Sequence, residues 1–176
     1  MTSDRREIAN HLLTQHADVR EAVVVETAGR TGQNTELLAL VRPDGYCSGA
    51  DLRDALISSV GLEPSPPVVV LVSDEAGWAE ARADHRRLVE LAAGSPYVYE
   101  WREPAGEVER SLCDVVADCL GRDRVSPVDN FVDIGGDSVT AIKVVTELER
   151  RYGIALPLES LFEARSIAEV VQPANP

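Results

Sequence analysis

A pair of glycines followed by an acid and a serine is the part of this sequence whose residue types could do chemistry. Gly135, Gly136, Asp137 and Ser138 stand directly before a helical apolar pattern. Two glycines allow the backbone a tight turn, which would present the serine at the beginning of a helix. A serine there is commonly the N-cap of the helix, whereas free N–H groups at the same place could hold a phosphate. The residues alone leave both interpretations open.

Several familiar site motifs are absent around this serine. Lys143 follows Ser138 by five residues, which is not the spacing of a P-loop. The residues after Ser138 also lack the glycine of a hydrolase nucleophile elbow. The histidines all lie in the first half of the chain, at His11, His16 and His85. A serine hydrolase would therefore need its base from that half.

The run at 130–139 resembles the thiolation site of peptidyl carrier proteins, the carrier domains of nonribosomal peptide synthetases. It reads NFVDIGGDSV, close to the family's NFFDxGGxS followed by Ile or Leu, with Val132 in place of the usual second aromatic residue. A later run at 156–164, LPLESLFEA, is similar to the family's LPLxxLFEAPT ending. The likeness extends over residues 105–172.

This resemblance implies that Ser138 carries a covalent 4′-phosphopantetheine arm, flanked by the motif residues Gly135, Gly136 and Asp137. A phosphopantetheinyl transferase would install the arm from coenzyme A with Mg²⁺, and its thiol would hold an amino acid or peptide as a thioester. The serine is an acceptor, so we expect no catalytic residue and no metal ligand in this chain. The other expected partners are a trans-acting adenylation enzyme and a downstream condensation or tailoring enzyme, as in antibiotic biosynthesis.

Hydrophobic patterning predicts two units of different fold class. Residues 1–93 read as a small α+β domain, with helices around a three-stranded sheet. Residues 94–106 read as a linker. Residues 107–176 read as an all-α four-helix carrier bundle. The expected strands cover 21–26, 36–42 and 68–72, and the longer expected helices cover 50–60, 79–93, 108–120 and 138–152.

The helix expected over 138–152 carries apolar residues on more than one side. Its spacing predicts that Val139, Ile142, Val145 and Leu148 point inward. The resemblance offers another role for the first two, because carrier domains contact partner enzymes near the arm. Val139, Ile142 and Leu161 are therefore expected to be partner contacts or core residues.

The first unit resembles the small C-terminal subdomain of adenylation enzymes. The runs EIANHLLTQHADVREAVVV at 7–25 and LALVRP at 38–43 carry this likeness. That family's catalytic lysine lies in an NGKxDRRxL run, but the corresponding ARADHRRL at 81–88 contains none, and Lys143 is the only lysine in the sequence. Arg82 does not replace it, since arginine and lysine are not interchangeable at such a site. We expect a truncated subdomain, without the ATP-binding portion and without adenylation chemistry.

The net charge and the cysteine spacing argue against several classes of function. Seventeen basic residues against thirty acidic ones give a net charge of −13, which argues against nucleic-acid binding and against docking on anionic membranes. The three cysteines are widely spread and lack the C-x-x-C spacing of a zinc or redox site. No apolar core follows the N-terminus as a secretion signal requires. We therefore expect a cytoplasmic protein.

Two alternatives to a peptidyl carrier remain open. An acyl carrier for polyketide or fatty-acyl groups would use the same serine, although the peptide-type flanking residues argue against it. An enzyme is the other alternative, with the first half assisting a reaction through His85 or Arg82.

Overall fold

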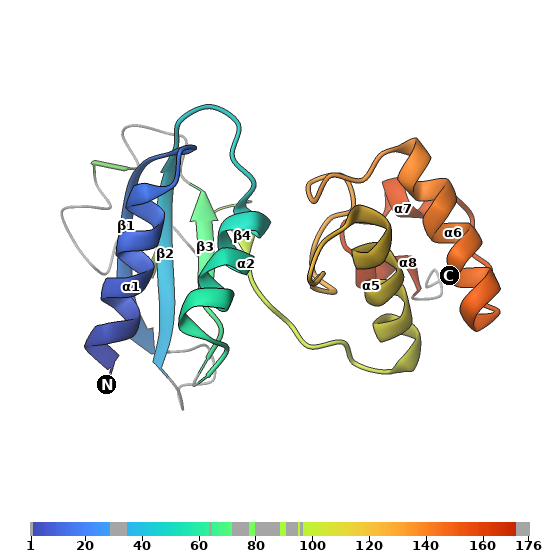
Figure 1. Cartoon of the computed structure of the whole chain (residues 1–176), viewed down its shortest axis with the longest axis horizontal. Coiled ribbons are helices and arrows are strands. Elements are labelled where there is room, and N and C mark those ends of the chain that lie inside the picture. The colour runs from blue at the N-terminus through green and yellow to red at the C-terminus, as the bar shows by residue number, and fades with distance from the viewer. Residues whose placement is uncertain are drawn as a thin grey trace. The chain divides into compact units, whose positions relative to one another are not determined.

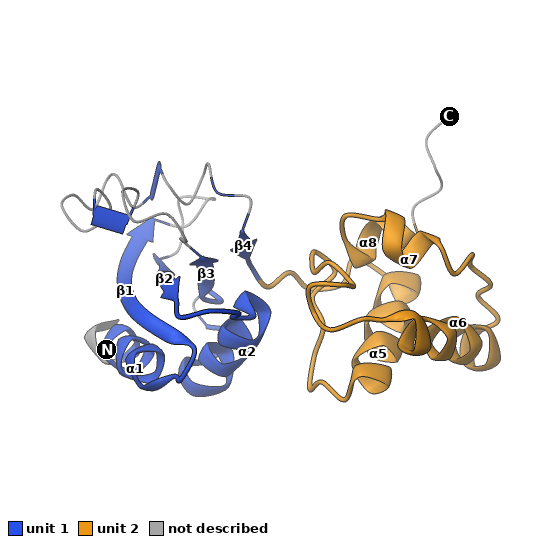
Figure 2. Cartoon of the chain, turned by 90° about the horizontal axis from the view of Figure 1, so that it is seen from above, with its two compact units in different colours: residues 1–100 blue, residues 101–176 orange. Residues whose placement is uncertain are grey.

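The computed structural model describes residues 2–28, 35–63, 65–71, 78–79, 89–90, 95 and 97–171. The chain divides into two compact units, Met1–Glu100 and Trp101–Pro176 (Figure 2). Each unit has its own secondary structure.

A four-stranded sheet in the order β1-β2-β3-β4 forms the centre of the first unit (Figure 1). β1 (Val19–Ala28) pairs antiparallel with β2 (Thr35–Pro43), and β2 pairs parallel with β3 (Val68–Leu71). β4 (Val98–Tyr99) pairs antiparallel with β3. The prediction of a three-stranded sheet was wrong, because the structure adds β4 as a fourth strand. β4 lies inside the segment predicted as a linker, and two residues are too few to show an alternating pattern.

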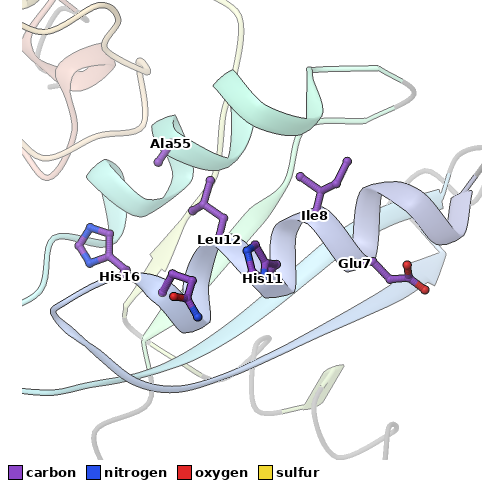
Figure 3. A pocket seen from close by; sticks show the side chains of 7 residues that line it. Glu7, Ile8, His11, Leu12, His16 and Ala55 are labelled. Atoms are coloured by element: carbon purple, nitrogen blue, oxygen red, sulfur yellow. The ribbon is translucent and has the colours of Figure 1, made fainter.

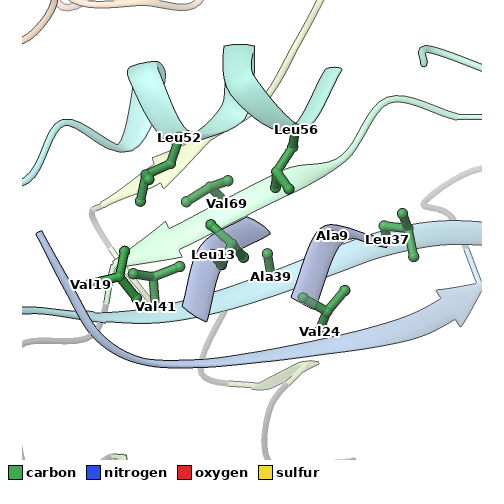
Figure 4. Close-up of a cluster of buried hydrophobic side chains, with 10 residues drawn as sticks. All are labelled: Ala9, Leu13, Val19, Val24, Leu37, Ala39, Val41, Leu52, Leu56 and Val69. Carbon is green, nitrogen blue, oxygen red and sulfur yellow. The ribbon is translucent and has the colours of Figure 1, made fainter. Parts of the chain in front are cut away.

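β2 occupies an inner position because its apolar run is buried on both faces. One face carries Ala39 and Val41 and is covered by α1 (Thr2–Gln15) and α2 (Gly49–Val60), as Figure 4 shows. Leu38 and Leu40 point to the opposite face, where Trp78 packs with them. Side chains of a strand alternate between its faces, so one continuous apolar segment supplies both clusters. Most of the helix predicted over 79–93 lies outside the described residues.

The second unit is helical, and its described residues, 101–171, contain no strand. Its helices are α5 (Glu107–Leu120), α6 (Ser138–Tyr152), α7 (Ser160–Glu163) and α8 (Ile167–Val170). The two long helices pack against each other through apolar side chains, and the loop between them adds Phe131 to the buried set. Two of the four helical segments are a single turn each, so the four-helix carrier bundle stays a prediction.

The inward face of α6 differs from the predicted one. Ala141, Val144 and Leu148 are buried, whereas Val139 and Ile142 are 62% and 58% exposed. The prediction that Val139 and Ile142 point inward was therefore wrong. α6 has apolar residues on two sides, and periodicity alone does not say which side meets the core. Within the carrier unit, this side of α6 is therefore exposed.

Arg5 joins the two helices of the first unit. Its Nε donates to the carbonyl of Val60 at 3.0 Å, and its Nη2 donates to the carbonyls of Gly61 and Ser65, also at 3.0 Å. The last carbonyls of a helix have no partner within the helix, so a guanidinium from α1 satisfies the end of α2.

Replacing this side chain tests its contribution to the unit. Arg5→Ala should lower the free energy of unfolding of the N-terminal unit by about 1–3 kcal/mol, because three hydrogen bonds to carbonyls are lost. Urea unfolding of the full chain, followed by circular dichroism, measures the change. Arg6→Ala is the matched control, since Arg6 is exposed on the same helix. Equal losses in both variants would contradict the role given to Arg5.

Candidate functional site

The loop before α6 is a compact turn closed by backbone hydrogen bonds. Gly136 N donates to the carbonyl of Phe131 at 2.8 Å, and Gly135 N donates to the carbonyl of Val132 at 3.0 Å. The side chain of Asn130 accepts from the N–H groups of Val132 and Asp133 at 2.9 and 3.2 Å. These bonds fix the path of the chain immediately before Ser138.

Both glycines are required by this backbone, each for its own reason. Gly135 has φ +99°, a conformation that residues with a side chain rarely adopt. A Cβ added to Gly136 would lie 2.4 Å from the Phe131 ring and 2.5 Å from the Phe131 carbonyl oxygen. The glycine pair therefore allows a tight turn to close against a buried ring.

Phe131 anchors the turn to the rest of the unit. Its side chain is 1% exposed and meets the ring of Phe162 edge to face, with centroids 5.7 Å apart. The preceding loop is also bound to α8, because Ile167 N donates to the carbonyl of Asp129 at 2.9 Å. Phe162 belongs to the LFEA run at 161–164, which carried part of the family resemblance. This run therefore helps to hold the turn through the contact between Phe162 and Phe131.

Asp137, not Ser138, is the N-cap of α6. Its carboxylate accepts from Thr140 N at 2.8 Å, and Thr140 Oγ1 accepts from Asp137 N at 2.8 Å, which completes a capping box. Hydrogen bonds from Thr140 hold the pKa of Asp137 below its usual value. The interpretation of Ser138 as the N-cap was wrong, and Asp137 has a defined structural task in the motif.

Ser138 is the first residue of α6 and its side chain is exposed. Among the described residues, none forms a hydrogen bond with its hydroxyl, and no histidine belongs to residues 101–171. His11 and His16 belong to the first unit, and His85 lies outside the described residues. A free hydroxyl held in a fixed place suits a group that accepts a substituent from another enzyme, rather than one that attacks a substrate by itself.

Several apolar side chains of the carrier unit are exposed. Val139 and Ile142 follow Ser138 within the first turns of α6, and Val132 in the turn and Phe162 in α7 are exposed as well. Leu161 is only 1% exposed and packs in the core. Val139, Ile142 and Leu161 were each expected to be either a partner contact or a core residue, and Leu161 is a core residue. Val132 and Phe162 were missed as surface residues, although both lie within the runs that carried the resemblance.

The cysteine side chains of the protein are poor candidates for a reactive thiol. The three cysteines are free, and Cys113 is buried in α5. Burial, together with the nearby charges of Glu109 and Asp114, raises the pKa of Cys113 to about 12. A thiol that stays protonated is a poor nucleophile.

The first unit contains an open groove of about 680 Å³ between α1 and α2 (Figure 3). Its lining combines three apolar residues with four polar ones: Ile8, Leu12 and Ala55, and Glu7, His11, Gln15 and His16. His16 Nδ1 accepts from the backbone of Asp18 at 3.3 Å. The described lining includes no serine or cysteine, so this groove does not form a nucleophile–base pair.

Residues 110–172 match the family model "Phosphopantetheine attachment site". The C-terminal unit of this chain therefore belongs to the phosphopantetheine attachment family, and its covalent cofactor is 4′-phosphopantetheine. A domain of this kind carries its cargo and is not catalytic. The chain's relatives are nonribosomal peptide synthetases, and this unit is a carrier domain of their class.

Curated relatives align with both units of the chain. Tyrocidine synthase 3 of Brevibacillus parabrevis is 28% identical over 160 residues, which is 91% of this chain and 2% of that protein. Surfactin synthase subunit 1 of Bacillus subtilis is 30% identical over 162 residues, 91% of this chain and 4% of that protein. Isonitrile lipopeptide synthase of Mycobacterium tuberculosis is 30% identical over 155 residues, 88% of this chain and 6% of that protein. The chain thus spans only a small fraction of these relatives' length.

Two solved structures are also similar to parts of the chain. A structure described as a nonribosomal PCP domain is 36% identical and covers 42% of this chain and 99% of its own, with a TM-score of 0.38. McyG A-PCP complexed with phenylalanyl-adenylate is 18% identical and covers 92% of this chain and 29% of its own, with a TM-score of 0.36. Within the described residues, no helix has the length and apolar character to cross a membrane.

The capping role of Asp137 predicts a pH-dependent effect on stability. Asp137→Ala should lower the unfolding temperature of the carrier unit by a few degrees at neutral pH, because the first turn of α6 loses its cap. The pKa of Asp137 is lowered by folding, so its contribution is present above the ordinary value of 3.8 and is lost as pH falls through the folded value. The difference between the variant and the wild type should therefore shrink at acid pH, as measured by thermal unfolding.

Two further variants make this test specific. Asp137→Asn should retain most of the stability, since an asparagine also caps a helix. Asp133→Ala removes an exposed acid from the same turn and should have little effect. A loss with Asp133→Ala equal to that with Asp137→Ala would contradict the capping assignment.

Proposed function

We propose that Ser138 is the residue that carries the phosphopantetheine arm, and that the chain holds an amino acid or peptide on it as a thioester. The observation that supports this most strongly is the exposed serine at the first position of α6, inside the region that matches the family. Gly135, Gly136 and Asp137 shape the backbone around it, so the flanking motif acts through structure. Nonribosomal peptide or related natural-product synthesis is the proposed context.

The chain's own contribution to attachment is one nucleophilic hydroxyl. In the proposed transfer, Ser138 Oγ forms a bond to the β-phosphorus of coenzyme A, the bond to the adenosine 3′,5′-bisphosphate portion breaks, and the hydroxyl proton passes to a base on the transferase. The transferase and its Mg²⁺ supply the catalysis. When bound, the arm supplies a terminal thiol that carries the acyl group.

The apolar surface of Val132, Val139, Ile142 and Phe162 is the proposed docking face for enzymes that act on the arm. Each of these side chains is exposed, and Val139 and Ile142 follow Ser138 within the first turns of α6; exposed apolar side chains that form a patch are typical of a contact surface. The net charge of −13 favours partners with basic rims around their entrances, since opposite charges speed productive encounter. The partners proposed for this face are the phosphopantetheinyl transferase and a condensation or tailoring enzyme.

The N-terminal unit is proposed to have no adenylation activity of its own. Lys143 is the only lysine in the sequence and belongs to the carrier unit. The region that corresponds to the adenylation lysine, with Arg82 and His85, lies outside the described residues. We therefore propose that a separate adenylation enzyme loads the carrier in trans. The subdomain-like unit would serve as a scaffold or docking surface, followed by a carrier of the four-helix type.

Attachment is tested by mass. The full chain, incubated with coenzyme A and a broad-specificity phosphopantetheinyl transferase, should gain the mass of one arm, and Ser138→Ala should gain none. Ser166→Ala is the matched control, because Ser166 begins α8 without a side-chain cap bond, and it should be loaded like the wild type. An arm on the Ser138→Ala protein would place the site elsewhere.

The cargo is tested on the arm-bearing protein. With ATP, amino acids and an added adenylation enzyme, the chain should gain an aminoacyl group that hydroxylamine releases as expected for a thioester. Without the added enzyme it should gain nothing. Loading by acyl groups alone would support the acyl-carrier alternative, and loading by ATP and amino acids without the enzyme would refute trans loading.

A further inference from the structure

The chain between the sheet and α5, predicted as a linker, is bound tightly at both of its ends. Its first part belongs to the sheet of the N-terminal unit. Tyr99 pairs with Val69 in β3, and Leu71 N donates to the carbonyl of Tyr97 at 3.1 Å. The sheet therefore holds this segment as far as Tyr99.

A buried arginine fixes the next residue. Arg53 in α2 is 0% exposed, and its Nη1 donates to the carbonyl of Glu100 at 3.0 Å. Its Nε and Nη2 donate to Asp54 Oδ1 at 3.0 and 2.8 Å, which pairs the buried charge. Close packing adds to this, because a Cβ on Gly49 would lie 2.1 Å from the Tyr99 ring. The N-terminal unit therefore holds the chain as far as the carbonyl of Glu100.

Arg102 is bound in the same way to the carrier unit. Its backbone N–H donates to Ser126 Oγ at 3.1 Å, and Ser126 is fully buried. Its guanidinium forms a bidentate pair with Glu109 in α5, at 3.0 and 2.7 Å. Glu109 also accepts from Ala105 N, so one carboxylate holds two points of the segment.

Trp101 folds onto the same surface. The Arg124 guanidinium lies 5.8 Å from the centre of the Trp101 ring, a cation–π arrangement, and Trp101 Nε1 donates to Glu103 Oε1 at 2.9 Å. Residues 101–105, here named the strap, are thus attached to the carrier unit before its first helix begins.

We propose that the strap is an integral part of the carrier unit and that the Glu100–Trp101 peptide is the joint of the chain. Hinges in proteins are commonly a few residues at the ends of elements, where the backbone dihedral angles change. In place of a long flexible linker, this chain would have one short pivot between two anchored residues. The proposal does not depend on which residue carries the arm.

Hydrogen exchange of the full chain tests the strap directly. The Arg102 and Ala105 amides should exchange slowly in the wild type, and Glu109→Ala should raise both rates about tenfold or more, because their anchor is lost. Glu107→Ala removes an exposed acid from the same turn of α5 and should leave the rates unchanged. Exchange at both amides in the wild type as fast as in an unstructured chain would overturn the proposal.

Matched insertions test the joint. Gly-Ser-Gly placed between Glu100 and Trp101 should shorten the rotational correlation times of both units in ¹⁵N relaxation measurements, because the pivot becomes a flexible linker. The same insertion between Ala105 and Gly106 should leave the correlation times as in the wild type, since the strap stays attached. Equal effects of the two insertions, or no effect of the first, would overturn the assignment of the joint.

Discussion

The close approach of Gly136 to Phe131 is the constraint on which the carrier site depends. The Gly136 N–H reaches the Phe131 carbonyl at 2.8 Å, and no side chain larger than hydrogen fits between that residue and the buried ring. Because Phe131 is held in turn by Phe162, the position at which α6 begins is set by the core of the unit. Ser138, two residues after Gly136, is exposed, while the backbone before it is held in place. The proposed acceptor of a large prosthetic group needs both properties.

Because of the capping box, Asp137 and Ser138 have different tasks in the motif. Asp137 binds the free N–H groups of the first turn of α6, so the helix begins without any contribution from the Ser138 side chain. The hydroxyl is then available for modification without loss of helix stability. Gly135, Gly136 and Asp137 thus have structural tasks, and the chemical task is the one proposed for Ser138. The proposed function needs partner enzymes, and the exposed side chains of Val139 and Ile142, next to Ser138 on α6, are candidates for their contacts.

Much of this architecture could be predicted from the sequence, and the failures have physical causes. The apolar run of β2 and the amphipathic pattern of α5 are long enough to identify their elements, and the motif predicted which residues form the site. β4 was missed because two residues carry no period. The orientation of α6 was missed because Val139 and Ile142 are as apolar as the buried Val144 and Leu148, and only the packed partner decides between two such faces. Asp137 and Ser138 are equally good caps by residue type, so only the coordinates show that Asp137 caps α6.

The central claim is that Ser138 carries a phosphopantetheine arm and its cargo in the cell. Mass spectrometry of the protein purified from its own cells, with fragmentation of the peptide that contains residues 130–143, tests this claim most directly. The account predicts the mass of the arm on Ser138, with an aminoacyl or peptidyl group on part of the population that is lost on treatment with hydroxylamine. An unmodified Ser138 throughout, or an arm on another residue, would contradict it.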